Sequence, residues 1–222
     1  MGILYPCPQK QLPLEEKSQM NINEPYKATF TREQFLFYEM RTVAGLMLEN
    51  KTDDEIVSEI YENNLFQYPT EKSTKRMAKN CLKRLYLLDD MRLVRIIAKG
   101  ASDSARQVCL YAMMNQFRVV YEFMTGVIAE KYRVRDYTFN KRDVNIFFSR
   151  LQEQSDTVAS WSDSTIAKLK QVIMKMLVDT EFIDNIKSET LNHVFIDFEL
   201  KNILEEKGEY SVLAVFNCIE DE

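Results

Sequence analysis

The stretch from Thr52 to Leu88, TDDEIVSEIYENNLFQYPTEKSTKRMAKNCLKRLYLL, decides the fold that we predict for this chain. It opens with Thr52 and Glu55 in the spacing of a helix capping box, and the apolar residues that follow lie on one helical stripe. Pro69 closes a short link, and a third helix is predicted after it, from about residue 72 to residue 88. Together with an earlier periodic segment, for which Thr31 is the predicted cap, these segments predict an N-terminal unit of three helices.

The third predicted helix carries lysine and arginine on one side and apolar residues on the other. A helix-turn-helix protein places its recognition helix at this point in a run of short helices. Lysine and arginine neutralise phosphates, and serine, threonine and asparagine reach phosphates or base edges. The alternative is a solvated helix face, which is what most runs of charge are. The residues predicted to contact nucleic acid here are Lys72, Ser73, Thr74, Lys75, Arg76, Lys79, Asn80, Lys83 and Arg84.

Charge is distributed unevenly along a chain whose net charge is -5. Residues 70–99 contain nine Lys and Arg against three Asp and Glu, whereas residues 181–222 contain three against eleven. A local positive field of this kind attracts a polyanion, while the acidic remainder keeps the protein soluble and limits indiscriminate binding.

The composition predicts a mainly α-helical protein. The chain has only five glycines and five prolines in 222 residues, which favours long helices over a sandwich or barrel with many turns. Asp89 and Asp90 predict a turn and a cap for the next helix. One long helix or two abutting helices are predicted from near Ser102, and a helix end is predicted at Gly208.

Three regions are expected along the chain. Residues 1–25 hold four of the five prolines and predict an extended arm. Residues 26–90 form the predicted three-helix domain, which is helix-turn-helix-like, and residues 91–222 form a larger helical C-terminal domain. Within the latter, EFIDNI and LNHVFID flank a turn-like KSET and are compatible with a short β-hairpin that would resemble the wing of a winged helix.

A second cluster of cations alternates with aromatic residues in EKYRVRDYTFNKR, residues 130–142. Cations interleaved with aromatic rings can grip a nucleic-acid backbone and stack on bases. The same pattern is typical of a loop whose aromatic residues are buried. The candidate nucleic-acid contacts here are Arg133, Arg135, Lys141 and Arg142.

The sequence lacks the signatures of catalysis and of metal binding. It contains no phosphate-binding or dinucleotide-binding glycine motif, and its single histidine nearly excludes His-based triads and multi-histidine metal sites. The four cysteines form no CxxC pair, so neither zinc spacing nor a dense disulfide framework is indicated. We therefore predict no enzyme activity, no catalytic residue, no metal site, no cofactor and no small-molecule substrate.

The sequence also gives an expectation for location. No apolar run approaches the roughly 20 residues that are needed to cross a bilayer. The N-terminal residues lack the pattern of a signal peptide, and the cysteine usage suits a reducing compartment. A cytoplasmic protein without membrane contact is expected.

Phrases within residues 26–88 carry a resemblance. The segment YKATFTREQFLFYEMRTVAGLMLEN, the link ENNLFQYPTEKS and the basic helix that ends in KRL resemble the BrxA family, small proteins of bacterial BREX phage-defence operons formerly described as uncharacterised inner-membrane proteins. The resemblance implies a cytoplasmic, non-enzymatic accessory component with a helical fold that binds DNA or RNA. The inner-membrane description finds no support in the sequence.

Two functions remain open at this point. The first is an accessory protein that binds duplex DNA, in preference to RNA, mainly through phosphates and with modest sequence preference. The second is an assembly subunit of the defence complex, whose basic helix docks an acidic surface of another BREX protein or the acidic tail of a second copy.

Overall fold

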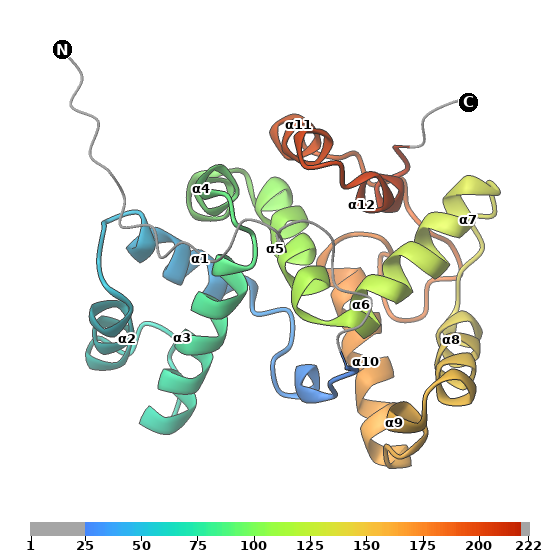
Figure 1. Ribbon diagram of the computed structural model, residues 1–222, viewed down its shortest axis with the longest axis horizontal. Helices are drawn as coiled ribbons and strands as arrows, with labels where there is room; N and C mark the ends of the chain where they lie inside the picture. The colour runs from blue at the N-terminus through green and yellow to red at the C-terminus, as the bar shows by residue number, and fades with distance from the viewer. Residues whose placement is uncertain (1–24, 219–222) are drawn as a thin grey trace.

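The computed structural model describes residues 25–218 of the chain, and they are mainly helical, as predicted (Figure 1). The predicted N-terminal arm, residues 1–25, lies outside the described residues except for Pro25. The helices are η1 (Thr29–Thr31), α1 (Phe37–Met47), α2 (Asp53–Glu62), α3 (Glu71–Tyr86), α4 (Met91–Lys99), α5 (Ser102–Gln116), α6 (Arg118–Phe123), the π-helical turn η2 (Met124–Ile128), α7 (Ala129–Arg133), α8 (Lys141–Gln154), α9 (Asp156–Ala159), α10 (Asp163–Asp179), α11 (Phe198–Glu206) and α12 (Tyr210–Val215).

Side-chain caps fix several helix starts where the sequence predicts them. Thr52 and Glu55 form the predicted capping box of α2, and the Asp90 side chain caps α4. Thr70 caps α3 by accepting a hydrogen bond from the backbone N–H of Ser73, so α3 begins one residue before the predicted start. Gly208, with a φ of 71°, follows the end of α11, as predicted.

The predicted cap at Thr31 is wrong. Thr31 belongs to the short η1, and α1 begins only at Phe37, after Leu36 in a left-handed conformation with a φ of 56°. Phe30 is fully buried, and its ring lies 5.3 Å from the ring of Phe117. This contact with a residue far along the chain fixes the backbone at η1, and α1 begins only after this segment.

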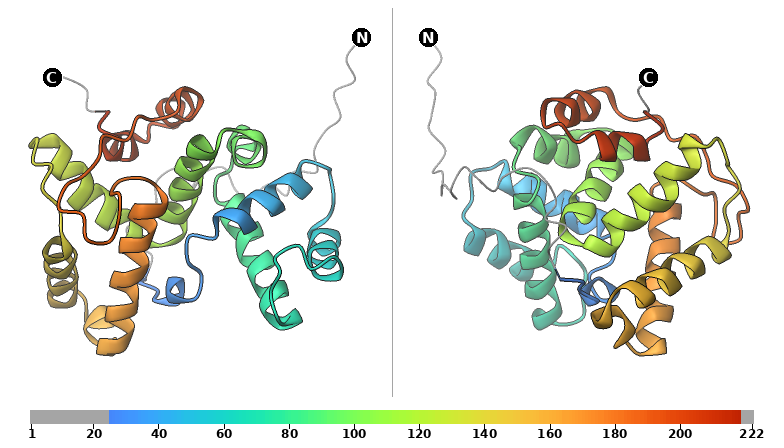
Figure 2. Two further views of the ribbon diagram at one scale, coloured as in Figure 1. Left: turned by 180° about the vertical axis from the view of Figure 1, so that it is seen from behind. Right: turned by 45° about the vertical axis from the view of Figure 1, so that its right-hand side comes forward.

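The N-terminal helices pack around α1 and lead into α5 at the centre of the molecule (Figures 1 and 2). α3 packs on α1 and α2, and α4 packs on α1 and α5. One hydrophobic core runs from Phe30 to Phe216 through both halves of the chain. This core is continuous across residue 90, and the division into two domains at that residue stays a prediction.

The β-hairpin with which residues 181–197 are compatible does not form, since these residues contain no strand pair in the structure. Their backbone pairs instead with residues 137–139. Thr138 and Thr190 form an isolated antiparallel bridge, and the N–H of Leu191 donates to the carbonyl of Tyr137 at 2.7 Å. The hydrogen bonds that a hairpin would need are therefore made to a different part of the chain.

Candidate nucleic-acid interface

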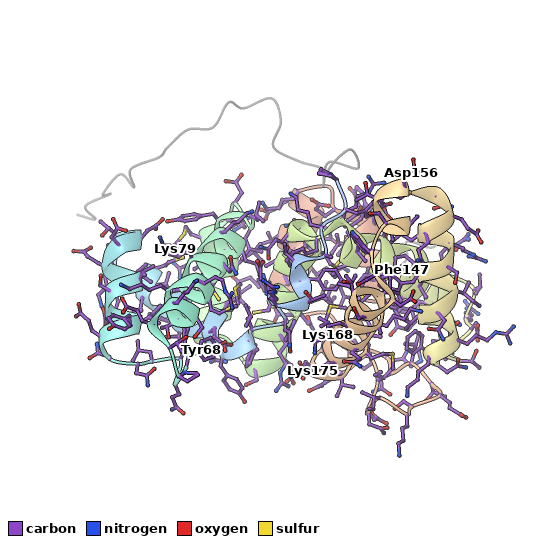
Figure 3. All side chains as sticks on the ribbon, turned by 90° about the horizontal axis from the view of Figure 1, so that it is seen from below. Tyr68, Lys79, Phe147, Asp156, Lys168 and Lys175 are labelled. Carbon is purple, nitrogen blue, oxygen red and sulfur yellow. The ribbon has the colours of Figure 1, made fainter. Side chains whose placement is uncertain are left out.

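The outer face of α3 is a row of cations. Lys72, Arg76, Lys79 and Lys83 are exposed, while Met77, Ala78, Cys81, Leu82 and Leu85 on the opposite side are buried. This segregation follows from the 3.6-residue period of the helix, since positions 72, 76, 79 and 83 repeat on one side. Figure 3 shows Lys79 on α3, apart from Lys168 and Lys175 on α10. We call Lys72, Arg76, Lys79 and Lys83 the basic row.

The cations of the basic row have no carboxylate partner among residues 25–218, since none of them forms a salt bridge there. Lys75, beside the row, does have one. It bonds to Glu71 one turn earlier and lies 4.7 Å from the ring centroid of Tyr61. The hydrogen bond that Lys75 donates to Glu71 raises the pKa of Lys75. Four like charges in a row repel one another, so an anionic ligand is favoured on this face.

Neighbouring groups hold α3 in place. The hydroxyl of Tyr68, in the link before the helix, donates to Glu39 of α1 at 2.6 Å, and burial raises the pKa of Tyr68. The Ser73 hydroxyl donates to the Thr70 carbonyl at 2.8 Å, so it completes the cap. Ser73, predicted as a nucleic-acid contact, therefore serves the start of the helix.

Two of the predicted contacts, Arg84 and Thr74, lie in the interior and correct the prediction. Arg84 is fully buried, and its guanidinium donates to the backbone carbonyls of Glu33, Gln34 and Phe35 and to the side-chain oxygen of Gln116. Burial lowers the pKa of Arg84, but an arginine stays protonated in proteins and these oxygens satisfy its donors. Arg84 thus joins α3 to α5 and to the segment before α1.

Thr74 is only 1% exposed, and its hydroxyl donates to the Thr70 carbonyl at 3.0 Å. Because both are buried, the side chains of Thr74 and Arg84 are not accessible to a ligand in solvent. Asn80 is half-buried, and its Nδ2 atom is buried with no hydrogen-bond partner among the described residues. Asn80 is one of the predicted nucleic-acid contacts, but no sequence pattern indicates that its amide nitrogen is buried.

The second predicted cluster lies at the far end of the molecule from α3, around α7 and the start of α8 (Figures 1 and 2). Arg133 is paired with Glu130, whereas Arg135, Lys141 and Arg142 are exposed. The structure therefore does not bring the two clusters together. Tyr132 and Phe139 are buried, so these two rings are not available to stack on bases.

The described residues contain no group of three or more His, Cys, Asp and Glu side chains placed to hold a metal ion. Cys81, Cys109 and Cys218 are free thiols. Burial raises the pKa of Cys109 to about 12, so this thiol is not a nucleophile near neutral pH. None of the helices within residues 25–218 is long and apolar enough to span a membrane.

These features define the class of the protein: a mainly α-helical protein with a row of exposed cations on one helix, for which residues 25–218 supply no carboxylate partner. The chain belongs to the BrxA family, whose model matches residues 24–208. It is 37% identical to a BREX protein BrxA of Bacillus cereus (strain H3081.97) over 73% of this chain and 80% of that protein. It is 25% identical to a BREX protein BrxA of Escherichia coli O9:H4 (strain HS) over 80% of this chain and 83% of that protein.

A solved structure supports the fold. The crystal structure of an uncharacterized protein from Magnetospirillum magneticum aligns with a TM-score of 0.72 and 23% identity, over 88% of this chain and 100% of the other. At this level of identity the likeness establishes the fold alone.

Proposed function

We propose that this BREX component is a non-enzymatic accessory protein of a phage-defence system, and that it binds double-stranded DNA through the basic row of α3. One observation carries the proposal. A chain of net charge -5 keeps four exposed cations on one helix face and gives them no carboxylate partner among the described residues. Like charges on one exposed helix face repel one another, and an anion that binds to the face relieves this repulsion.

The basic row is suited to a phosphate backbone. From Lys72 to Lys83 the helix rises by roughly 16 Å, a length along which duplex DNA presents several phosphates. Contacts of lysine and arginine to phosphate fix a protein on the duplex but carry no sequence information. We therefore expect affinity for every duplex sequence, with modest preference.

The rest of α3 provides stiffness for this role. The Thr70 cap, the Tyr68–Glu39 bond and the Arg84 contacts hold the helix at its start, its flank and its end. Because these contacts already fix the backbone of α3, little backbone freedom is lost when a ligand binds to the basic row.

The test is a fluorescence anisotropy titration of the purified protein alone with a labelled duplex, repeated over a series of salt concentrations. Saturable binding is expected, with log affinity falling linearly with log salt at a slope of about -3 to -4 if all four cations meet phosphates. A single strand and an RNA duplex of the same sequence establish the preference for duplex DNA. The proposal fails if the folded protein shows no duplex binding at low salt, and the basic row is then better explained by docking to an acidic protein.

A further inference from the structure

The link between α10 and α11 exposes large apolar side chains beside α7, away from the basic row (Figure 1). Near the end of this link Phe195 is 88% exposed, and Phe198 at the start of α11 is 77% exposed. Single exposed apolar residues are ordinary on proteins, but two phenylalanine rings three residues apart are typical of a surface that another molecule covers.

Residues 193–196 of the link show the alternation of a β-strand without belonging to a sheet. His193 and Phe195 are exposed, whereas Val194 and Ile196 are half-buried and pack against the core. This two-residue alternation is typical of an extended chain, because its successive side chains point to opposite faces. We call residues 193–196 the extended segment.

The backbone of the extended segment is largely unpaired. Its four N–H groups donate no hydrogen bond to any group of residues 25–218, and the carbonyls of His193 and Val194 accept none there. Gln107 fixes the end of the segment, since its side chain donates to the Phe195 carbonyl and accepts from the N–H of Asp197, both at 2.8 Å. An exposed backbone with free donors and acceptors is a template on which another chain can pair.

A hollow of about 520 Å³ adjoins the extended segment and is acidic. Residues 192–195 line it together with three carboxylates, those of Asp103, Glu181 and Asp184. Arg106 lies 3.0 Å from Glu181 and 3.8 Å from Asp103 and neutralises part of their charge. Asp184 forms no salt bridge with a cation of residues 25–218. We call this surface the acidic hollow.

The charge of the acidic hollow selects the kind of molecule that it can bind. One arginine faces three carboxylates, and the guanidinium of Arg106 also lies 5.2 Å from the ring of Phe37, which keeps it on one side of the hollow. Residues 181–222 as a whole contain three Lys and Arg against eleven Asp and Glu. Nucleic acid is repelled here, and a lysine or arginine side chain is attracted.

We propose that the extended segment and the acidic hollow form a docking surface for another protein, which binds as an extended peptide with a lysine or arginine two residues from an apolar residue. The peptide pairs with the free backbone groups of residues 193–196, its cation enters the hollow toward Asp184, and its apolar side chain covers Phe195. The two-residue spacing follows because both side chains must point to the same face of the peptide. In strand addition, main-chain hydrogen bonds supply affinity and pockets for alternate side chains supply specificity.

This docking surface goes beyond the proposed function and does not rest on it. The basic row of α3 lies elsewhere on the molecule and stays accessible when the peptide is bound (Figure 1). If both proposals hold, the protein holds a second protein beside the duplex.

The first test is a selection from a displayed library of random twelve-residue peptides on the immobilised full chain. Peptides with a lysine or arginine two residues from an apolar residue should be enriched. The double variant Asp184→Asn with Phe195→Ala, run in parallel, should not enrich them. A selection without such peptides, or with the same peptides enriched on the folded double variant, would overturn the proposal.

The second test is fluorescence anisotropy with a labelled synthetic copy of an enriched peptide. Asp184→Asn should weaken binding about fivefold, because it removes the charge but keeps an oxygen that can accept the 2.8 Å hydrogen bond from Asn192. Phe195→Ala should weaken binding about tenfold while circular dichroism and thermal unfolding stay unchanged, because the ring is exposed. Glu153→Gln is the matched control. It removes an exposed carboxylate of α8 and should bind within about twofold of the wild type.

Amide hydrogen exchange then distinguishes strand addition from attraction between charges. The bound peptide should slow exchange at residues 193–196 by about tenfold or more and leave α3 unchanged. Peptide binding without this protection would overturn the pairing with the extended segment. Peptide affinity that weakens as the protein concentration rises would show that a second copy occupies the surface, and would overturn its assignment to another protein. None of these results depends on whether the protein binds DNA.

Discussion

The two cation-rich regions of this protein, α3 and residues 130–142, look alike in sequence and differ in structure. In α3, the basic row stands on one helix face without a described carboxylate partner. In residues 130–142, Lys131 and Arg133 are neutralised by Asp136, Asp143 and Glu130, and the remaining cations project from a turn and a helix start. Positive charge in a sequence therefore indicates an anion-binding face only where the backbone separates it from acids.

The largest expected effect concerns Arg84, the buried cation of α3. Arg84→Ala should lower the free energy of unfolding by about 3 kcal/mol or more, since it leaves buried carbonyl groups of the segment before α1 without donors. Lys83→Ala, its neighbour on the exposed face, should change it by less than about 0.5 kcal/mol. Urea unfolding followed by circular dichroism measures both. Equal stability of the two variants would contradict the structural role of Arg84.

A double substitution in the basic row tests whether this row binds duplex DNA. Arg76→Ala with Lys79→Ala should weaken duplex binding roughly tenfold to a hundredfold at moderate salt, by a similar factor for every sequence. The salt slope should become shallower by about two units, because two fewer counterions are released. Anisotropy titrations measure both quantities.

The matched control removes the same charge from α10, through Lys168→Ala with Lys175→Ala (Figure 3). These lysines are exposed, so their removal lowers the net charge of the protein by the same amount and leaves the basic row unchanged. Binding by the control should stay within about twofold of the wild type. If both double variants bind equally weakly, the interaction is not localised on α3.

A third substitution tests the interior of residues 130–142. Lys131→Ala should lower the free energy of unfolding by about 1 kcal/mol, because its side chain is only 14% exposed and bridges Asp136 and Asp143. Duplex affinity should change far less than in the α3 double variant. Thermal unfolding and anisotropy are measured on the same preparation. A loss of binding free energy larger than the loss of unfolding free energy would refute the structural role of Lys131.

The smallest expected effect is a dependence of folding stability on pH. Hydrogen bonds from the Thr138 hydroxyl, then from Lys131 and the Thr138 N–H, lower the pKa of Asp136 to about 2. A carboxyl whose pKa is lower in the folded state contributes stability above its unfolded pKa of about 4, and loses it as the pH falls toward 2. Asp136→Asn should therefore be less stable than the wild type at pH 6, and the difference should shrink between about pH 4 and pH 2. A difference independent of pH in urea unfolding would show that the charge of Asp136 is not responsible.

The sequence by itself determined the helices, several of their ends and the basic row, because the causes are local. A capping side chain acts within three residues, as at Thr52 and Asp90, and the 3.6-residue period sorts polar from apolar positions without reference to the rest of the chain. The exposed cations of α3 were predicted in this way, and the family was indicated by the phrases of residues 26–88.

Tertiary structure alone decided what depends on distant partners. Arg84 and Lys83 are adjacent cations in one helix, yet only Arg84 meets carbonyl groups some fifty residues earlier, and no local pattern encodes that encounter. The pairing of Leu191 with Tyr137 in place of a hairpin, and the burial of Phe30 against Phe117 that moves the start of α1, have the same origin. Each contact forms because the assembled core brings together groups that the sequence keeps far apart, and buried polar groups must find partners wherever the fold supplies them.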